Sequence, residues 1–136
     1  MIPIRDFPTV KELPEVFDAT VLAKTIDITK WKAYSLFRSE SFPFYDIDGK
    51  KSVFRSNFVE WLSGQPITPL EQLEVIQKLP ENFPPKLLQS VLAVSKSKVY
   101  TLVHARNFPA MQLEGQIIVN KSYFILWLKT KRNLGN

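Results

Sequence analysis

The chain contains one segment of about 50 residues twice, and this duplication constrains its fold more than any other feature. Residues 13–62 align with residues 79–128 at a constant offset of 66 and without a gap. Such register between rare residue types is not a chance match, so the sequence predicts two copies of one small fold unit. The coinciding pairs include Pro14/Pro80, Phe17/Phe83, Tyr34/Tyr100, Phe42/Phe108, Gly49/Gly115, Phe58/Phe124 and Trp61/Trp127.

The repeats set the expected domain boundaries. We expect a first unit at residues 1–64 that includes an N-terminal extension, and a second unit at 79–136 that ends in a basic tail. Residues 65–78 would link them. In this linker, Thr68 and Glu71 have the spacing of a capping box around a helix that begins at Pro69. A short helix that packs between the units is favoured, and a flexible tether is the alternative.

Each copy shows the same succession of local patterns. Asp18 is a suitable N-cap for a first helix, and Thr29 or Ser95 for a second helix that ends before Phe-Pro. A hairpin with a glycine turn follows, and Ser56 or Ser122 would cap a last short helix. The phenylalanine of Phe-Pro and the tryptophan of the last helix are expected in the core. The order helix, turn, helix, hairpin, helix predicts a winged helix-turn-helix unit in a mainly α protein with small β-hairpins, of class α+β.

Composition excludes several classes of protein. The chain has no cysteine and a single histidine, His104. We therefore expect no metal site, no cofactor and no enzyme, because no constellation of acid, base and nucleophile is present. The Asp-Gly turn near residue 48 is not a calcium loop, since Arg55 stands where an EF-hand needs glutamate. No apolar run could span a membrane or serve as a signal peptide, so we expect a cytoplasmic protein.

Charge favours a polyanionic partner through its distribution along the chain. The net charge is +5 and the pI is near 9.5. Seven basic and seven acidic residues in 13–62 cancel (7 − 7 = 0), whereas five basic and two acidic residues in 79–128 leave +3 (5 − 2 = 3). In both copies, two lysines stand at the start of the second helix, where a solvated face is the ordinary alternative to contact with DNA.

The second helix of each copy carries the motif of a known family. The stretches "ITKWKAYSLF" from Ile28 and "VSKSKVYTLV" from Val94 share a cap, two lysines and a tyrosine. With the preceding Leu-Pro, the glycine hairpin and the terminal Trp-Leu, each copy resembles the excisionase-type winged helix-turn-helix domain, a relative of the MerR-type DNA-binding domain. The tandem chain is also similar to the small accessory DNA-binding proteins of Gram-positive conjugative plasmids (TraN-like).

The chain departs from this family at two places. The family usually has glycine in the turn between the first two helices, where this chain has Asp27 and Ala93. Its hairpin is usually basic, as Lys50 and Lys51 make the first one, whereas the second reads Gly-Gln-Ile-Ile from Gly115.

The resemblance implies a non-enzymatic protein that binds double-stranded DNA. Its second helices would enter the major groove, and its hairpins would contact the DNA backbone or minor groove. A helix fits the major groove, and its N-terminal turn presents free N–H groups to phosphate. A monomer with two such helices would act as an internal pseudo-dimer. The expected DNA-binding residues are Thr29, Lys30, Trp31, Lys32, Tyr34, Ser35, Arg38, Lys50, Lys51, Arg55, Ser95, Lys96, Ser97, Lys98, Tyr100, Thr101, Arg106 and Lys121.

Several alternatives stay open. Tyr34 and Tyr100 would donate to phosphate or close the core as half-buried rings. Trp31 would contact DNA or pack between the copies, and His104 would lie at the surface. The resemblance favours an accessory or regulatory factor of a mobile element, active in plasmid conjugative transfer or excision, with other proteins of a nucleoprotein complex as further partners. A transcriptional regulator and a protein-interaction adaptor without DNA binding are the alternatives.

Overall fold

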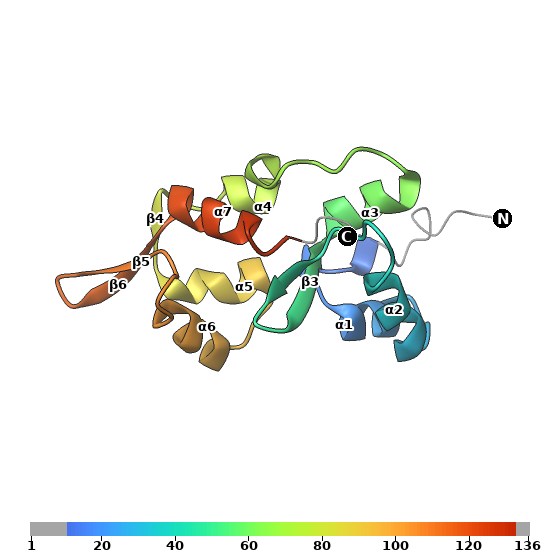
Figure 1. Ribbon diagram of the computed structural model, residues 1–136, viewed down its shortest axis with the longest axis horizontal. Coiled ribbons are helices and arrows are strands. Elements are labelled where there is room, and N and C mark those ends of the chain that lie inside the picture. The colour runs from blue at the N-terminus through green and yellow to red at the C-terminus, as the bar shows by residue number, and fades with distance from the viewer. Residues whose placement is uncertain (1–10, 133–136) are drawn as a thin grey trace. The chain divides into compact units, whose positions relative to one another are not determined.

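The computed structural model describes residues 11–132 and divides into two compact units (Figure 1). Unit 1 consists of Met1–Thr68 with Arg132–Asn136, and unit 2 consists of Pro69–Lys131. Helices and small antiparallel sheets occur in both, so the expected α+β class is confirmed. Residues 1–10 of the expected N-terminal extension and 133–136 of the basic tail lie outside the described residues.

Unit 1 contains three α-helices and one small sheet within its described part. The strands have the order β1-β3-β2, and both neighbouring pairs are antiparallel. Along the chain the elements are β1 (Val16–Phe17), α1 (Ala19–Thr25), α2 (Lys30–Phe37), β2 (Tyr45–Ile47), β3 (Lys50–Phe54) and α3 (Arg55–Ser63).

Unit 2 repeats this order after two short helices of its own. Its strands have the order β4-β6-β5, again with antiparallel pairs. The elements are η3 (Leu70–Gln72), α4 (Glu74–Gln77), β4 (Asn82–Phe83), η4 (Pro85–Leu87), α5 (Leu88–Leu92), α6 (Lys96–Val103), β5 (Ala110–Leu113), β6 (Gln116–Asn120) and α7 (Lys121–Lys129), where η marks a 3-10 helix.

The sequence repeat is also a structural repeat. The helices α6 and α7 and the strand β6 begin and end 66 residues after α2, α3 and β3. The strand register is the same, because Phe17 pairs with Val53 and, 66 residues later, Phe83 pairs with Val119. Equal bounds and equal register show that the two copies adopt the same backbone course.

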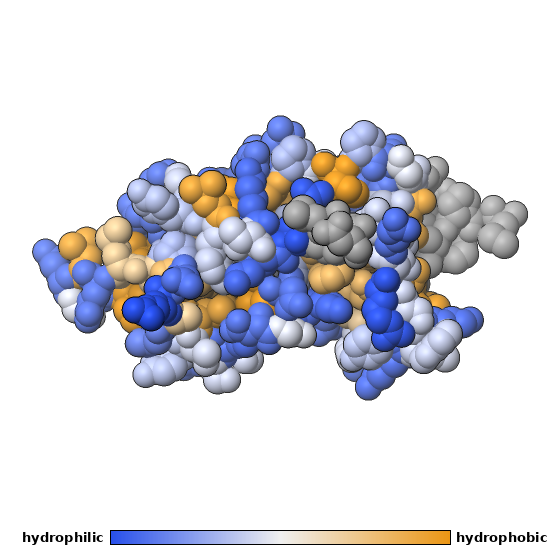
Figure 2. Space-filling view, viewed as in Figure 1, coloured by the Kyte–Doolittle hydropathy of each residue, from blue (hydrophilic) through white to orange (hydrophobic). Residues whose placement is uncertain are grey.

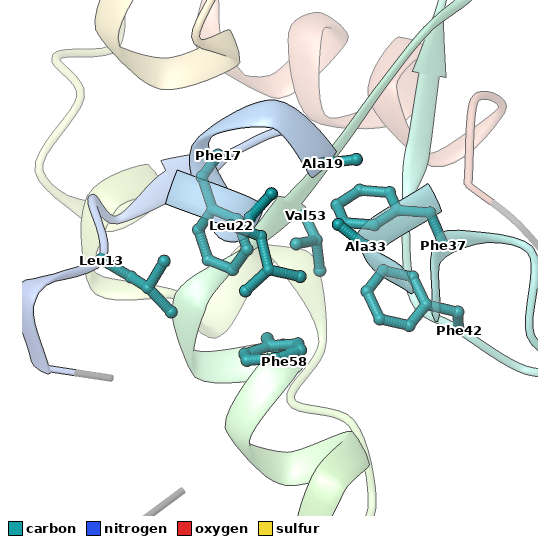
Figure 3. Packing of buried hydrophobic residues seen from close by; sticks show 10 residues of the cluster. Leu13, Phe17, Ala19, Leu22, Ala33, Phe37, Phe42, Val53 and Phe58 are labelled. Atoms are coloured by element: carbon teal, nitrogen blue, oxygen red, sulfur yellow. The ribbon is translucent and has the colours of Figure 1, made fainter. Parts of the chain in front are cut away.

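An aromatic cluster forms the core of each unit. In unit 1, Phe17 and Phe58 meet edge to face at 5.5 Å between ring centroids, and Phe42 packs beside them (Figure 3). The expected core role of Phe42 and Trp61 is confirmed, since their rings pack edge to face at 4.8 Å. The equivalent rings of unit 2 have the same 4.8 Å separation. Each buried phenylalanine contributes about 1.5–3 kcal/mol by leaving water.

The predicted caps of the first and second helices are confirmed. Asp18 Oδ1 accepts a hydrogen bond from the backbone N–H of Val21 at 3.0 Å. Ser95 Oγ does the same for Lys98 at 3.2 Å, and Thr29 caps α2 in the same way. Each cap satisfies one of the free N–H groups of a helix start, which stabilises the helix by about 1 kcal/mol.

The predicted caps of the last helices are wrong. Both helices begin two residues earlier than these caps require, so Ser56 and Ser122 lie inside α3 and α7. The backbone N–H of Arg55 donates to the carbonyl of Glu15, which continues the β1–β3 pairing up to the first helical residue. No loop therefore separates strand from helix. Asn120 caps α7 instead, since its Oδ1 accepts from the N–H of Tyr123 at 3.1 Å.

The predicted capping box of the linker is also wrong. The segment forms η3 and α4, but the cap position of η3 is Pro69 and carries no side-chain hydrogen bond. The hydroxyl of Thr68 donates to Glu60 Oε2, and its N–H donates to Glu60 Oε1 at 3.0 Å. Thr68 thus closes unit 1, whereas η3 packs against α7 in unit 2.

The tight turn between the first two helices uses left-handed backbone in both copies. Asp27 has φ 57° and Ala93 has φ 55°. Glycine adopts this conformation without cost, and aspartate tolerates it better than alanine. Residues other than glycine at these two positions therefore add strain to the turns, most of it at Ala93.

Candidate nucleic-acid interface

The second helix of each unit buries one face and exposes the other. In α2, Ala33 and Phe37 are buried at a four-residue spacing, and in α6 the buried pair is Val99 and Leu102. This spacing puts the lysines on the outer face. The exposed residues are Lys30, Trp31, Lys32 and Tyr34 in α2, and Lys96, Ser97, Tyr100 and Thr101 in α6, whereas Lys98 is half-buried.

The cap hydroxyls lie at the N-terminal ends of these two exposed faces. Thr29 and Ser95 are both exposed, and each hydroxyl oxygen accepts a backbone N–H of its own helix. A hydroxyl that accepts in this way still has its own hydrogen to donate. Each helix start therefore combines a hydroxyl donor, two lysines and the positive end of the helix dipole.

The two tyrosines point away from the core. Tyr34 is 47% exposed and Tyr100 is 67% exposed, so neither ring closes the core. Tyr100 packs on His104 at 4.3 Å between ring centroids, and His104 Nδ1 donates to the Tyr100 carbonyl oxygen at 2.9 Å. Both phenol groups remain accessible to an external acceptor.

Trp31 is the largest difference between the two helix faces. Its side chain is 72% exposed. A tryptophan in a core buries a large apolar surface, and Trp31 leaves most of that surface in solvent. A shallow groove of about 340 Å³ runs beside it along α2, toward Leu36 and Ser39. At the equivalent position α6 has the small residue Ser97, which is also exposed.

A second groove in unit 1 brings the helix and the hairpin together. It has a volume of about 570 Å³, and its lining includes Tyr34 of α2, Arg38 directly after α2, and Lys50 and Lys51 of β3. Lys50 Nζ lies 3.9 Å from the carboxylate of Asp18, so its charge is partly balanced. The structure thus gathers four of the predicted site residues around one opening.

Four predicted residues, of which Arg38 also lines this groove, lie in the C-terminal part of the second helices or just beyond them. Arg38 and Arg106 are exposed. Ser35 is half-buried, and its carbonyl oxygen accepts from Ser39 Oγ at 3.1 Å. Thr101 is exposed, and its hydroxyl donates to the carbonyl oxygen of Ser97 at 3.1 Å. The two arginines are therefore the better placed of the four to reach an anion.

Arg55 and Lys121 have a different environment from the other predicted residues. Arg55 Nη1 donates to the carbonyl oxygen of Leu13 at 2.6 Å, and Lys121 Nζ donates to the equivalent carbonyl of Leu79 at 3.0 Å. Both side chains thus hold the segment that leads into the first strand of their unit. Arg55 aligns with Lys121, and this shared position was the sequence signal for a common structural role. Neither side chain belongs to the interface proposed below.

The described residues offer no metal site, because no three acidic or histidine side chains gather in a group that could hold an ion. Within residues 11–132, no helix has the length and apolar content needed to cross a bilayer. Comparisons of the chain with protein-family models, with curated proteins and with solved structures found no match.

Proposed function

We propose that the protein binds double-stranded DNA through two winged helix-turn-helix units, with α2 and α6 as recognition helices. The observation that carries this proposal is the same set of residues on both helices: a capping hydroxyl, two lysines and a tyrosine, 66 residues apart. All of them are exposed except Lys98, which is half-buried. Repetition of a core position has a packing reason, but repetition of exposed Lys30 as Lys96 has none. A shared polyanionic partner supplies the reason.

The dimensions of the helices support this role. A helix with its side chains is about 10–12 Å in diameter, so α2 or α6 fits across a major groove about 12 Å wide. With the N-terminal turn directed at the DNA, the first lysines reach phosphates or the acceptor edge of guanine. Trp31 in one helix and Ser97 in the other would then read different base pairs.

The groove between α2 and the first hairpin supports a backbone contact. Arg38, Lys50 and Lys51 line it together with the phenol of Tyr34. Two carboxylates, Asp18 and Asp48, also line this opening, so the three cations leave it with a small positive excess. With the phenol as a donor, this excess suits a phosphate that lies beside the recognition helix. In unit 2 the hairpin carries Gln116 and Ile117 at the equivalent positions, so unit 1 would hold the backbone more firmly.

The proposed role is that of an accessory or regulatory factor that assembles on DNA of a mobile element, as in plasmid transfer or excision. A transcriptional regulator would use the same two helices. In either role the chain would act as a monomer with two internal half-site readers.

A salt titration of binding tests the proposal. We expect the intact chain to bind a site selected from a random duplex pool, with an affinity that falls steeply as salt rises. Lys32→Ala and Lys98→Ala should each lower the logarithmic salt slope by about one if they contact phosphate. Lys24→Ala, which removes an exposed lysine of α1, is the matched control. Selection of no sequence, or unchanged binding by both variants, would refute the proposal.

A further inference from the structure

A groove is present in unit 2 where unit 1 has large side chains. In unit 1, the rings of Tyr45 and Phe54 pack edge to face at 5.5 Å, and Phe44 packs against the buried core cluster. The equivalent residues of unit 2 are Ala110, Met111 and Asn120. These smaller residues all line an opening of about 610 Å³ between β5 and α7.

The rim of this groove exposes large apolar side chains. Met111 is 50% exposed, Tyr123 is 64% exposed and Leu126 is 60% exposed. Leu113, beyond the groove on β5, is exposed as well. Figure 2 shows hydrophobic surface over the β5–β6 hairpin. Single apolar residues are common on protein surfaces, but a contiguous group marks an interaction site.

The same region of unit 1 shows what such a face can hold. In place of Tyr123 and Leu126, α3 has Asn57 and Glu60, and both bind Thr68: Asn57 Nδ2 donates to its carbonyl at 3.3 Å. At the free edge of β2, Arg132 forms an antiparallel bridge with Tyr45. In unit 1, therefore, extended main chain covers both α3 and the edge strand.

In unit 2 the corresponding edge is open. β5 is the outer strand of its sheet, and no other strand of residues 11–132 pairs with its far edge. The hairpin has a two-residue turn, which makes Leu113 and Gln116 a hydrogen-bonded pair. Hydrogen-bonded and non-hydrogen-bonded pairs alternate along an antiparallel ladder, so the next pair, Gln112 and Ile117, is not hydrogen-bonded. Gln112 therefore directs its backbone N–H and C=O away from β6, toward an added strand.

The charge at the groove selects the chemistry of the occupant. Among the described residues that line the groove, the charged one is Lys131. Its Nζ lies 5.4 Å from the centre of the Trp127 ring, which places the cation beside the apolar surface. An occupant with a carboxylate at this end would form an ion pair with Lys131, and its apolar side chains would pack on the adjacent apolar surface. A second copy of this chain, with a net charge of +5, is the less complementary partner.

We propose that unit 2 binds an extended acidic segment of another protein, which adds as a strand to the free edge of β5. Alternate apolar side chains of that segment lie on Met111, Tyr123 and Leu126, and a carboxylate lies near Lys131. The occupant supplies in unit 2 the cover that Thr68 and Arg132 supply in unit 1. This partner-binding face is additional to the proposed DNA interface.

Two variants that borrow residues from unit 1 test the proposal in the full-length chain. Tyr123→Asn with Leu126→Glu gives α7 the polar pair of α3, and Ala110→Phe fills the groove with the side chain that unit 1 carries. Both residue sets are compatible with this backbone, because unit 1 contains them. Gln89→Glu adds the same charge at an exposed position of α5 and is the matched control.

The probe is a short fluorescein-labelled peptide that alternates valine with aspartate, followed by fluorescence anisotropy and by amide shifts in the NMR spectrum. We expect the peptide to bind the native chain and Gln89→Glu, to shift the amide of Gln112, and to bind both groove variants about tenfold more weakly or worse. A peptide that alternates valine with lysine should bind about tenfold more weakly than the acidic one.

Four results would overturn the proposal. Equal binding of the two peptides would show that the groove does not select an acidic partner. Unchanged binding by both groove variants would show that the peptide binds elsewhere. Loss of DNA binding in the Asn/Glu variant would assign this face to the DNA interface instead. Self-association of the native chain that disappears in the Asn/Glu variant would make a second copy the occupant. Retained DNA binding and a monomeric native chain are the expected results.

Discussion

Unit 1 and unit 2 have the same backbone course but differ in what covers their surfaces. Both keep the aromatic core, the capped second helix and the cation that holds the entering segment. Their outer residues differ: in the alignment, Trp31 of unit 1 corresponds to Ser97 of unit 2, and Glu60 corresponds to Leu126. The comparison separates positions that the fold requires from positions that were free to acquire a separate task.

This division argues against a simple symmetric pair. A homodimer presents two identical surfaces, whereas a duplicated chain can change one copy without changing the other. The shared lysines and tyrosines favour a common partner for both units. The unshared tryptophan and hairpin charges favour two different half-sites on that partner.

The largest expected effect tests whether the two cores are equivalent. Phe58→Ala and Phe124→Ala remove fully buried rings at equivalent positions. Each should lower the free energy of unfolding by about 3–5 kcal/mol, because the cavity adds to the lost transfer energy. Denaturant unfolding of the full chain measures both. Costs that differ by more than about 2 kcal/mol would show that the two cores are not energetically alike.

The next effect distinguishes basic side chains that stabilise the fold from basic side chains of the proposed DNA interface. Arg55→Ala and Lys121→Ala each leave buried or half-buried carbonyls without a charged donor. We expect a loss of about 1–3 kcal/mol of stability in each and no change in the salt slope of DNA binding. A lower salt slope with unchanged stability would return both residues to the DNA interface.

A pH dependence is expected from Glu60 of unit 1, whose equivalent in unit 2 is the uncharged Leu126. Burial raises the pKa of Glu60, but hydrogen bonds from Thr68 and Asn57 outweigh it and hold that pKa below its ordinary value of 4.5. A lowered folded pKa contributes stability above pH 4.5, and this contribution is lost as the pH falls through the folded pKa. Thermal unfolding of Glu60→Gln should therefore depend less on pH below 4.5 than that of the native chain. An unchanged acid dependence would contradict the role of Glu60.

The smallest effect concerns the tight turns. Ala93→Gly should stabilise the protein by about 0.5–1 kcal/mol, because glycine removes the left-handed strain and loses part of the gain through chain entropy. Asp27→Gly should gain less, since aspartate tolerates φ 57° better than alanine tolerates φ 55°. Equal gains in thermal unfolding would show that residue type does not set the strain.

The alignment of the chain with itself predicted the repeat, and local patterns predicted the order of elements and the caps Asp18, Thr29 and Ser95, because these depend on residues close in the chain. The contacts that were not predicted involve partners elsewhere in the chain. Arg55 contacts a carbonyl 42 residues distant, and Thr68 contacts Glu60 across a chain reversal. No local pattern contains such contacts. The groove beside β5 follows from the size difference between Phe44 and Ala110, but the alignment alone does not show that the side chains of residues 11–132 leave this space open.

The central claim is that two non-identical helices of one chain read two half-sites. A methylation-protection footprint of the intact monomer, on a site selected from random DNA, tests this directly. We predict protection in two successive major grooves about 34 Å apart, roughly 10 base pairs, with different sequences in the two half-sites. Lys98→Ala should weaken only one of the two protected segments. Protection of a single groove, or a perfectly palindromic site, would contradict the account.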